Sequence, residues 1–424
     1  MNSLKEIILN DMKPALGVTE PGAIALASAM ARTLTTGEIE SLVVRMNSGI
    51  YKGAFTCSIP GTDRVGSLFA AALGCVSGNA KKGLLVLENI TKMDIEKADG
   101  LISSGKVRIE LADISSDLYI QSVVKTNQDE GEAVISGASH DNFTLLRKNN
   151  EQLLNIIPSS GEEKTAPDIL AYSLKDLYEY ARSAPVQDLA FMASAWKMNL
   201  ELALSSFESD ICIITKELLR QNGNVIYSND FQKTAVLLTC AAVEARVLGL
   251  NRPAMSITGS GNHGIISVMP LYALYKTEGC SEEQLLRGIA FSYLVTIYMK
   301  AHSGKIAPYC GCAIAAGSGA CCGIAIMKGA TPIQISGLLT TLSSSIVGMI
   351  CHGGNQGCVI KVLSALESGF HAVNLAMQNV YVDSMHGIAG ISPEQTMQNI
   401  GRIATPGMTA TEATIIDIIQ HHKC

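Results

Sequence analysis

The segment NNEQLLNIIPSSGEEKTAPD (149–168) separates two halves of the chain that differ in their pattern of apolar residues. It is polar and contains two prolines, which is typical of a linker. Before it, apolar and polar residues alternate as in strands, and after it apolar residues recur with helical spacing. The sequence therefore predicts an α+β protein, with a mixed α/β N-terminal domain (1–165) followed by an all-α C-terminal domain (166–424) rich in small-residue helices.

The strand-like and helical runs are distributed accordingly. Strands are expected at 39–47, 54–59, 83–90, 106–113, 118–127, 130–138 and 142–149. The N-terminal half also has helical patterns at 4–13, 18–34 and 65–78, and Thr19 is placed to cap the second of these. Beyond the linker, helices are expected at 170–205, 208–221, 231–249, 282–300, 312–328, 332–351, 358–379 and 411–421.

Composition narrows the class of protein. Of 424 residues, 47% are hydrophobic and 17% are charged, and the net charge of −6 does not indicate nucleic-acid binding. A mean hydropathy of +0.25 predicts a large core or a subunit interface, so we expect a homo-oligomer. The N-terminus lacks the apolar run of a secretory signal, and the most apolar stretch, 329–360, is broken by Pro332 and several glycines. We therefore expect a cytoplasmic protein without a membrane segment.

Twelve cysteines in a cytoplasmic protein are expected as core residues, catalytic groups or metal ligands rather than disulfides. Five are scattered, mostly among aliphatic neighbours, and are expected to be small core residues: Cys57, Cys75, Cys212, Cys240 and Cys280. Four others have glycines close by: Cys310, Cys312, Cys351 and Cys358. Glycine lets the backbone approach a bulky inorganic ligand and leaves amide donors for sulfide.

These four thiols occur in CGC (310–312) and CHGGNQGC (351–358), without the repeated knuckles of a zinc ribbon. A structural zinc is therefore the weaker alternative, and a cluster held by three cysteines with one iron left open fits better. Between Glu283 and Glu367 there is no Asp or Glu, while Lys and Arg do occur. Acidic neighbours would raise the cost of burying an anionic centre, so their absence is consistent with one. Core helices that are simply poor in acids would show the same pattern.

Two polar segments are candidate binding loops. ITGSGNHGIIS (257–267) opens an apolar helix and has the composition of an anion-binding nest, with a plain helix-capping loop as the alternative. Because it does not follow a strand in a βαβ unit, a dinucleotide site is excluded. Its candidate residues are Ser260, Gly261, Asn262 and His263. His302 and Ser303 precede CGC on a segment that could approach the same site or simply be solvated.

Taken together, these segments resemble the iron–sulfur L-cysteine desulfidases, which are related to the iron–sulfur L-serine dehydratases. The motifs that occur in the family's order are ALGVTEPGAIALA (15–27), IPGT (59–62), GSGNHG (259–264), KAHSGKIAPYCGC (300–312) and CHGGNQGC (351–358). The resemblance implies β-elimination of L-cysteine to sulfide, ammonia and pyruvate at a [4Fe–4S] cluster, without pyridoxal phosphate. The alternatives are L-serine or another β-substituted amino acid as substrate, or a non-catalytic relative that binds a small anion.

The resemblance also assigns the cluster ligands. It implies Cys312, Cys351 and Cys358, with Cys310 as the alternative first ligand. The dehydratases use a C-terminal cysteine in the resting site, and this chain ends in HHKC, so Cys424 becomes a candidate fourth ligand or plug.

The resemblance also suggests which residues bind the substrate and which could remove its α-proton. The substrate carboxylate would bind at the helix start that contains Thr19 and Gly22, or at the 257–267 loop, with Ser303 close to the site. In the desulfidases a cysteine normally precedes TEP, and the dehydratases carry a histidine there. This chain has Val18, which cannot accept a proton. The remaining candidates for the base are Glu20, His263 and His302.

Overall fold

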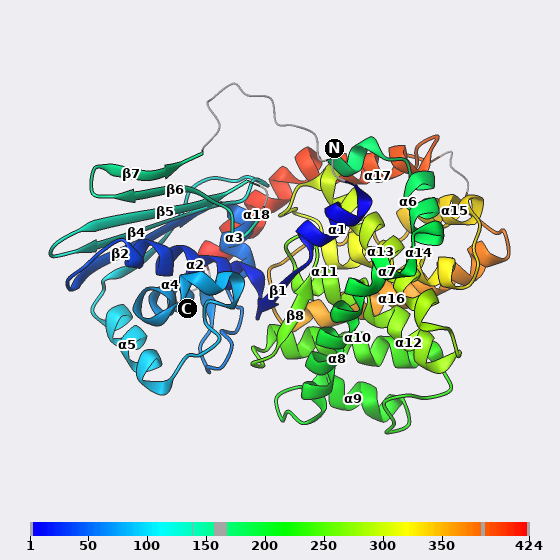
Figure 1. Ribbon diagram of the computed structural model, residues 1–424, viewed down its shortest axis with the longest axis horizontal. Coiled ribbons are helices and arrows are strands. Elements are labelled where there is room, and N and C mark those ends of the chain that lie inside the picture. The colour runs from blue at the N-terminus through cyan, green and yellow to red at the C-terminus, as the bar shows by residue number, and fades with distance from the viewer. Residues whose placement is uncertain (1–2, 138, 157–167, 383–385, 422–424) are drawn as a thin grey trace.

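The computed structural model describes residues 3–137, 139–156, 168–382 and 386–421. A part built on a sheet and a part built from helices lie next to each other (Figure 1). The last helix, α18 (Thr409–His421), returns to the sheet-containing part and packs against α3 (Ser48–Ala54). The predicted α+β class is confirmed.

Six strands form one mixed sheet in the order β3-β2-β4-β5-β6-β7. Their bounds are β2 (Ile39–Met46), β3 (Val107–Leu111), β4 (Tyr119–Thr126), β5 (Glu130–Ser136), β6 (Phe143–Lys148) and β7 (Glu151–Asn155). β2 and β3 are parallel, and the other neighbouring pairs are antiparallel. The alternating patterns predicted five of these strands, whereas β7 lies in the segment expected to be a linker.

Two alanine-rich helices, α2 (Thr19–Thr33) and α4 (Gly66–Ser77), pack on this sheet. The helix α3, the 3-10 turn η1 (Ala80–Leu85) and α5 (Lys92–Ser103) pack in turn against α2 or α4. α2 contacts β4 and β5 and also packs along α4. A Cβ atom at Gly74 would lie 2.3 Å from the carbonyl oxygen of Ala25, so the two helices approach closely because glycine stands there. The helix expected at 65–78 is thus confirmed, and its small residues explain the packing.

Two expected strands are wrong. Residues 83–90 lie in η1 and the turn after it. Residues 54–59 comprise the last residue of α3 and the segment after it, with a single isolated bridge between Ser58 and Val65. In the first case, the apolar side chains of Leu84 and Val86 are buried, and η1 contacts α2. Packing against a helix has therefore replaced the ladder that their strand-like composition suggested.

The helical part surrounds α13 (Glu282–Ser303), which is buried along most of its length. The other elements are η2 (Asp168–Ala171), α6 (Leu174–Ser183), α7 (Val186–Leu189), η3 (Ala190–Met192), α8 (Ala193–Phe207), α9 (Ile213–Gln221), α10 (Phe231–Val247), α11 (Gly261–Ile266), α12 (Met269–Thr277), the π-helical turn η4 (Cys312–Ala316), α14 (Gly317–Met327), α15 (Pro332–Ser343), α16 (Gly357–Met377), α17 (Pro393–Arg402) and the π-helical turn η5 (Ile403–Gly407). A Cβ atom at Gly319 in α14 would lie 2.2 Å from Oγ1 of Thr296 in α13. Small residues therefore set the distance between these helices, as expected.

The helix expected at 332–351 ends eight residues early, at Ser343. The hydroxyls of Ser343 and Ser344 donate to the carbonyl oxygen of Thr340, and that of Ser345 donates to the carbonyl of Leu342. Serine side chains that bond local carbonyls compete with helix continuation. The chain is thereby released into the loop that carries Cys351.

Two hydrophobic cores correspond to the two parts, but the N-terminus crosses between them. Leu4, Ile7 and Ile8 of α1 (Leu4–Asp11) belong to the core of the helical part. The next element, β1 (Lys13–Leu16), pairs antiparallel with β8 (Pro253–Ser256). The other core lies between the sheet and α2 and α4. The domain boundary expected at 165/166 lies outside the described residues.

A buried ion pair joins α18 to α3. The ammonium of Lys52 contacts the carboxylate of Glu412, and their side chains are 1% and 5% exposed. Removing one partner leaves the other charge buried without compensation, which costs about 3–5 kcal/mol. We expect Glu412→Leu to lower the free energy of unfolding by about that amount in chemical denaturation. The double variant Lys52→Met/Glu412→Leu should recover most of the loss, and a Glu412→Leu protein as stable as the wild type would contradict this role.

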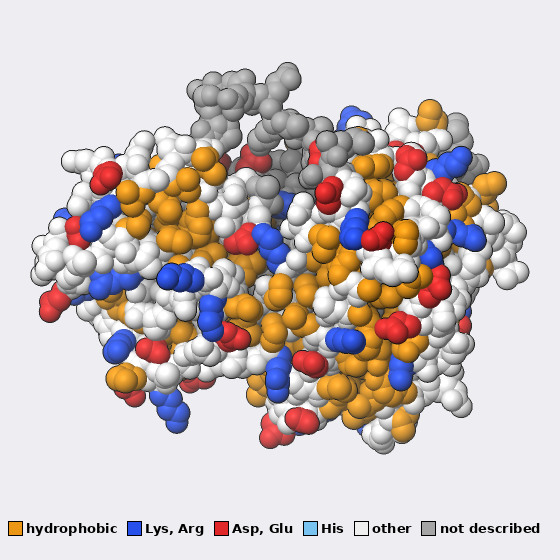
Figure 2. Space-filling view, in the orientation of Figure 1, with side chains coloured by type: hydrophobic (Ala, Val, Ile, Leu, Met, Phe, Trp, Pro, Cys, Tyr) orange, Lys and Arg blue, Asp and Glu red, His pale blue; other side chains and the backbone are white. Residues whose placement is uncertain are grey.

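No helix in the described ranges is long and apolar enough to cross a membrane. On the face shown in Figure 2, Lys and Arg side chains are interspersed with Asp and Glu. That face therefore lacks the large positive patch that attracts nucleic acids.

Candidate functional site

The two segments that carry the glycine-flanked cysteines lie side by side, although about forty residues separate them in the sequence. The amide of Cys310 donates to the carbonyl of Met349, and the amide of Cys351 donates to the carbonyl of Pro308, each at 2.8 Å. Cys312 follows at the start of η4. The antiparallel contact thus fixes CGC beside Cys351.

Cys358 approaches from the first turn of α16. Its amide donates to the carbonyl of Asn355 at 2.9 Å, and its thiol lies 3.6 Å from the carbonyl oxygen of Gly353. Burial raises the pKa of Cys358 to about 12, and the charges of Cys310 and Cys351 add to this effect. Cys358 therefore shares its surroundings with both cysteine segments.

Cys310 and Cys312 are coupled directly. A hydrogen bond between the two thiols lowers the pKa of Cys310 and raises the pKa of Cys312. Burial and the charges of Cys358 and Cys351 raise the pKa of Cys312 further. Because such effects require proximity, all four sulfurs occupy one neighbourhood.

Among the described residues, no three His, Cys, Asp or Glu side chains are close enough together to hold a single metal ion. A four-iron cluster is held at separate irons, so its ligand sulfurs stand wider apart than those around one tetrahedral zinc. Four thiols in one neighbourhood, two of them buried and two partly buried, suit such a cluster in the chemistry of their donors. The charges around them provide a second test of the fit.

Lys300, on α13, is a buried cation beside these thiols. It is 4% exposed, and within the described ranges it has no hydrogen bond or ion pair; its ammonium lies 5.4 Å from the centre of the Tyr309 ring. Burial and the charge of Lys305 lower the pKa of Lys300 to about 8, whereas the cysteine charges, led by Cys312, oppose this shift. A buried ammonium without a counter-ion is costly. Thiolates that hold an anionic cluster would supply the missing charge, so these residues fit the group.

Arg246 is a second buried cation, and it connects two of the predicted binding segments. Its guanidinium donates to Oγ1 of Thr19 and to Oδ1 of Asn262, each at 2.9 Å. Its Nε atom is buried without a partner among the described residues, and a Cβ atom at Gly261 would lie 2.4 Å from it. The glycine thus lets the arginine lie flat against the loop after β8. Arg246 is 2% exposed and forms no ion pair in the described chain, although the charge of Glu20 partly opposes the lowering of its pKa by burial.

The start of α2 differs from the prediction in one respect. Val18, not Thr19, is the N-cap residue, and no side chain caps the helix. Thr19 is the first helical residue, and its hydroxyl is used to accept from Arg246. The helix therefore presents an uncapped N-terminus next to a buried guanidinium, an arrangement that favours an anion. Gly22 lies one turn further on, with its amide bonded to the carbonyl of Val18.

His263 lies at the other predicted loop. Its Nδ1 atom is hydrogen bonded to Oγ1 of Thr258 at 2.5 Å, and a Cβ atom at Gly311 would lie 2.7 Å from its Nε2 atom. The ring is therefore packed against the glycine between Cys310 and Cys312. Burial and the charge of Lys300 lower the pKa of His263 well below its usual range, so the imidazole is neutral. α11 has only six residues, and Arg246 packs against Gly261 at its start. The anion-binding role expected for Ser260 to Asn262 stays a prediction.

Glu20, Val18 and Cys57 gather on the loop that carries Cys351 and Cys358. A Cβ atom at Gly354 would lie 2.5 Å from Sγ of Cys57 and 3.2 Å from Cγ1 of Val18. The Cys57 thiol donates to the carbonyl of Gly354 at 3.0 Å. Burial raises the pKa of Cys57, and the charge of Glu20 raises it further. Cys57 is thus buried in the core, as expected, and its thiol also lies beside residues 351–358, here called the cluster loop.

The last two predicted residues, His302 and Ser303, have different surroundings. The Nε2 atom of His302 is buried without a partner in the described chain, and the ring packs on Tyr298 in a pocket that also contains Glu394. Burial lowers the pKa of His302, and no cysteine contributes to that shift. Ser303 accepts a hydrogen bond from the hydroxyl of Tyr309 at 2.9 Å and so supports the CGC segment from behind.

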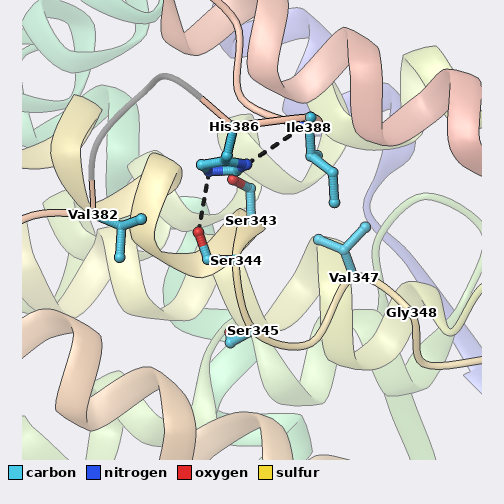
Figure 3. A pocket seen from close by; sticks show the side chains of 9 residues that line it. Ser343, Ser344, Ser345, Val347, Gly348, Val382, His386 and Ile388 are labelled. Atoms are coloured by element: carbon cyan, nitrogen blue, oxygen red, sulfur yellow. Dashed lines mark hydrogen bonds between the residues drawn. The ribbon is translucent and has the colours of Figure 1, made fainter.

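A separate open pocket lies at the end of α15 (Figure 3). In it, Nε2 of His386 is 3.1 Å from Oγ of Ser344, which resembles a nucleophile and its base. However, Nδ1 of His386 accepts from the amides of Ile388 and Ala389 at 3.4 Å. The ring proton is then on Nε2 and is donated to Ser344, so this serine is not activated.

Sequence patterns did not indicate Arg246, Lys300 or Cys57 as site residues. The available signal for Arg246 was its position inside the apolar run LLTCAAVEARVLGL (237–250), where a charge is expected to be paired or functional. Lys300 offered a similar signal near the end of the apolar helix α13. Cys57 offered none, because a cysteine among aliphatic residues is usually a core residue.

Comparison with known proteins places these features in a family. The family model described as "Serine dehydratase alpha chain" matches residues 81–417. A UPF0597 protein of Clostridium botulinum (strain Hall) is 38% identical over 425 residues, covering 99% of this chain and 98% of the relative. UPF0597 proteins of Clostridioides difficile (strain 630) and Clostridium tetani (strain Massachusetts) are 34% and 33% identical, with at least 97% of each chain covered. The chain belongs to the serine dehydratase alpha-chain family.

Proposed function

We propose that the protein is an iron–sulfur lyase that eliminates the β-substituent of a small L-amino acid without pyridoxal phosphate, and that its substrate is L-cysteine. The family is one of iron–sulfur dehydratases, which supports an enzyme with this type of centre. The observation that carries the proposal is the pair of buried cations, Arg246 and Lys300, which lie beside the cysteine segments and form no ion pair with a carboxylate of the described residues, although the charge of Glu20 also acts on Arg246.

Cys312, Cys351 and Cys358 would hold a [4Fe–4S] cluster, with Cys310 as the alternative to Cys312. When bound, the cluster supplies a Lewis acid that makes the β-substituent a better leaving group. Lys300 stabilises the negative charge of the thiolates from the α13 side, and its burial strengthens that interaction. Cys424 lies outside the described residues, so its role as a further ligand stays a prediction.

Arg246 would bind the substrate carboxylate. Its guanidinium is held by Thr19 and Asn262, so it needs little reorganisation when an anion arrives. The uncapped start of α2 adds backbone donors to the same place. Gly261 keeps the loop close to the guanidinium.

The base that removes the α-proton would be Glu20 or His263, since Val18 cannot accept a proton. Glu20 Cγ packs against Gly53 beside the cluster loop, and the neutral imidazole of His263 packs on Gly311. Loss of the α-proton and of the β-substituent leaves an aminoacrylate, which tautomerises to an imine. Water then releases pyruvate and ammonia, so one cysteine and one water give sulfide, ammonia and pyruvate.

Removing either candidate base tests these roles. We expect Glu20→Gln or His263→Ala to lower turnover about 10²-fold or more, because loss of a general base typically has this effect. Steady-state assays of pyruvate release on cluster-loaded protein would measure it. A Glu130→Gln variant, in the sheet, serves as the control. Unchanged turnover in both site variants would mean that another group removes the α-proton.

The wall of the site favours a thiol as leaving group. Beside the cluster loop stand a methyl group of Val18 and the Cys57 thiol, whose proton already faces the carbonyls of Gly53 and Gly354. Burying the hydroxyl of serine there without a partner costs more than burying a thiol. L-Serine is the second candidate, because the family model is named for serine dehydratase.

The proposal is tested on anaerobically reconstituted protein that has been freed of excess iron and sulfide. Sulfide with pyruvate from L-cysteine would support the desulfidase, and pyruvate mainly from L-serine would support the second candidate. Neither product from a protein with a full cluster would overturn the proposed activity and identify a relative that binds without elimination.

A further inference from the structure

His140 is a buried histidine that the proposed reaction has not used. It lies in the loop between β5 and β6 and is 3% exposed. Both of its ring nitrogens are buried without a hydrogen-bond partner among the described residues. A buried polar atom without a partner is costly, so two on one ring point to a bound group that the protein chain does not provide.

The position of His140 relates it to Arg246. A Cβ atom at Gly259 would lie 2.7 Å from Nδ1 of His140, so the ring rests on that glycine. Two residues later, Gly261 rests against Nε of Arg246, which also has no partner in the described chain. The same short loop therefore carries the imidazole at one glycine and the guanidinium at the next.

The charges around His140 determine its protonation state. Burial, followed by the charge of Lys305, lowers the pKa of His140 to about 3, and Arg246 and Lys300 act in the same direction. Asp141 opposes this shift, but it is engaged by Lys13 at 2.8 Å. The imidazole is therefore neutral, with one N–H donor and one nitrogen acceptor.

We propose that His140 is a specificity-determining residue that contacts the substrate, accepting from its α-ammonium group through one ring nitrogen while Arg246 binds its carboxylate. This inference rests on the proposed function of the site. A zwitterionic α-amino acid offers both groups on adjacent atoms, whereas a 2-hydroxy acid lacks the ammonium. His140 thus makes the site select α-amino acids, and it contributes this contact from the sheet-containing part of the molecule.

The test measures binding, which does not require elimination. L-Alanine and L-lactate both lack a leaving group, and they differ in the ammonium. On cluster-loaded protein, calorimetry should show L-alanine bound at least tenfold more tightly than L-lactate. His140→Phe should weaken L-alanine binding about tenfold to a hundredfold, the range for a hydrogen bond to a charged group, and remove most of the discrimination.

Two further variants separate binding from folding. His140→Gln keeps one donor and one acceptor, so it should retain most of the affinity and the selectivity. His371→Phe, on the exposed face of α16, should behave as the wild type. Equal binding of the two ligands by the wild type, or unchanged selectivity in His140→Phe, would overturn the role of His140. Either result can be read whether or not the protein forms sulfide or pyruvate.

Discussion

Replacing Cys351 or Cys358 with alanine is expected to abolish the thiolate-to-iron absorbance at about 400 nm in the reconstituted protein. Each residue is close to the other and to the CGC segment, so either loss leaves too few ligands in that neighbourhood. Iron and sulfide contents should fall together with the absorbance. Activity would be lost as a consequence, but the spectrum is the direct measurement.

A matched control is Cys75→Ala. Cys75 lies in α4 in the core of the sheet-containing part, where burial raises its pKa to about 12 and none of the four clustered cysteines contributes to the shift. Its loss should leave the spectrum unchanged. A full brown spectrum in both Cys351→Ala and Cys358→Ala would end the ligand assignment. The pair Cys310→Ala and Cys312→Ala then decides between the alternative first ligands, since only the true ligand should be required.

Replacing Arg246 with glutamine is expected to lower kcat/KM about 10³-fold, which corresponds to about 4 kcal/mol. The guanidinium is buried and held at two of its nitrogens, so the amide cannot restore its charge or its reach. We expect the loss to appear largely in KM, because a carboxylate contact made in the ground state also persists in the transition state. Substrate titrations of pyruvate release would measure both constants.

Arg246→Lys keeps the charge but cannot bridge Thr19 and Asn262 at once, so its kcat/KM should fall between those of glutamine and the wild type. Arg220→Gln is the control, since Arg220 is an exposed residue paired with Glu217 on α9. Thermal melting should accompany each assay, because Thr19 and Asn262 lose a partner in both Arg246 variants. A folded Arg246→Gln protein with an unchanged KM would contradict the carboxylate role.

Several features of the fold followed from local pattern. Helices 18–34 and 65–78 were predictable because alanine-rich segments bordered by glycine or proline have few alternatives, and alternation revealed five strands of the sheet. The strand predicted at 83–90 is absent and the helix predicted at 332–351 ends early, for different reasons. The first segment packs on α2 instead of pairing, and the second is ended by serine hydroxyls that bond local carbonyls.

The residues of the candidate site, too, could be predicted from the sequence only in part. The glycine-flanked cysteines could be identified from their neighbours in the sequence, whereas nothing beside Cys57 indicated that this core residue also contacts the loop at Gly354. His302, adjacent in sequence to Ser303, turns toward α17 instead of the cysteines. Proximity along the chain was therefore a poor guide to proximity in the site.

Residue type and local periodicity were enough to predict the α+β class, the order of most elements and the cysteines proposed as cluster ligands. The charges that accompany those thiols could be identified only in the folded chain. Arg246, Lys300 and His140 come from α10, α13 and the β5–β6 loop, and their roles depend on burial and on the absence of protein partners within the described residues. Those properties arise only when distant segments exclude water together, which no local pattern encodes.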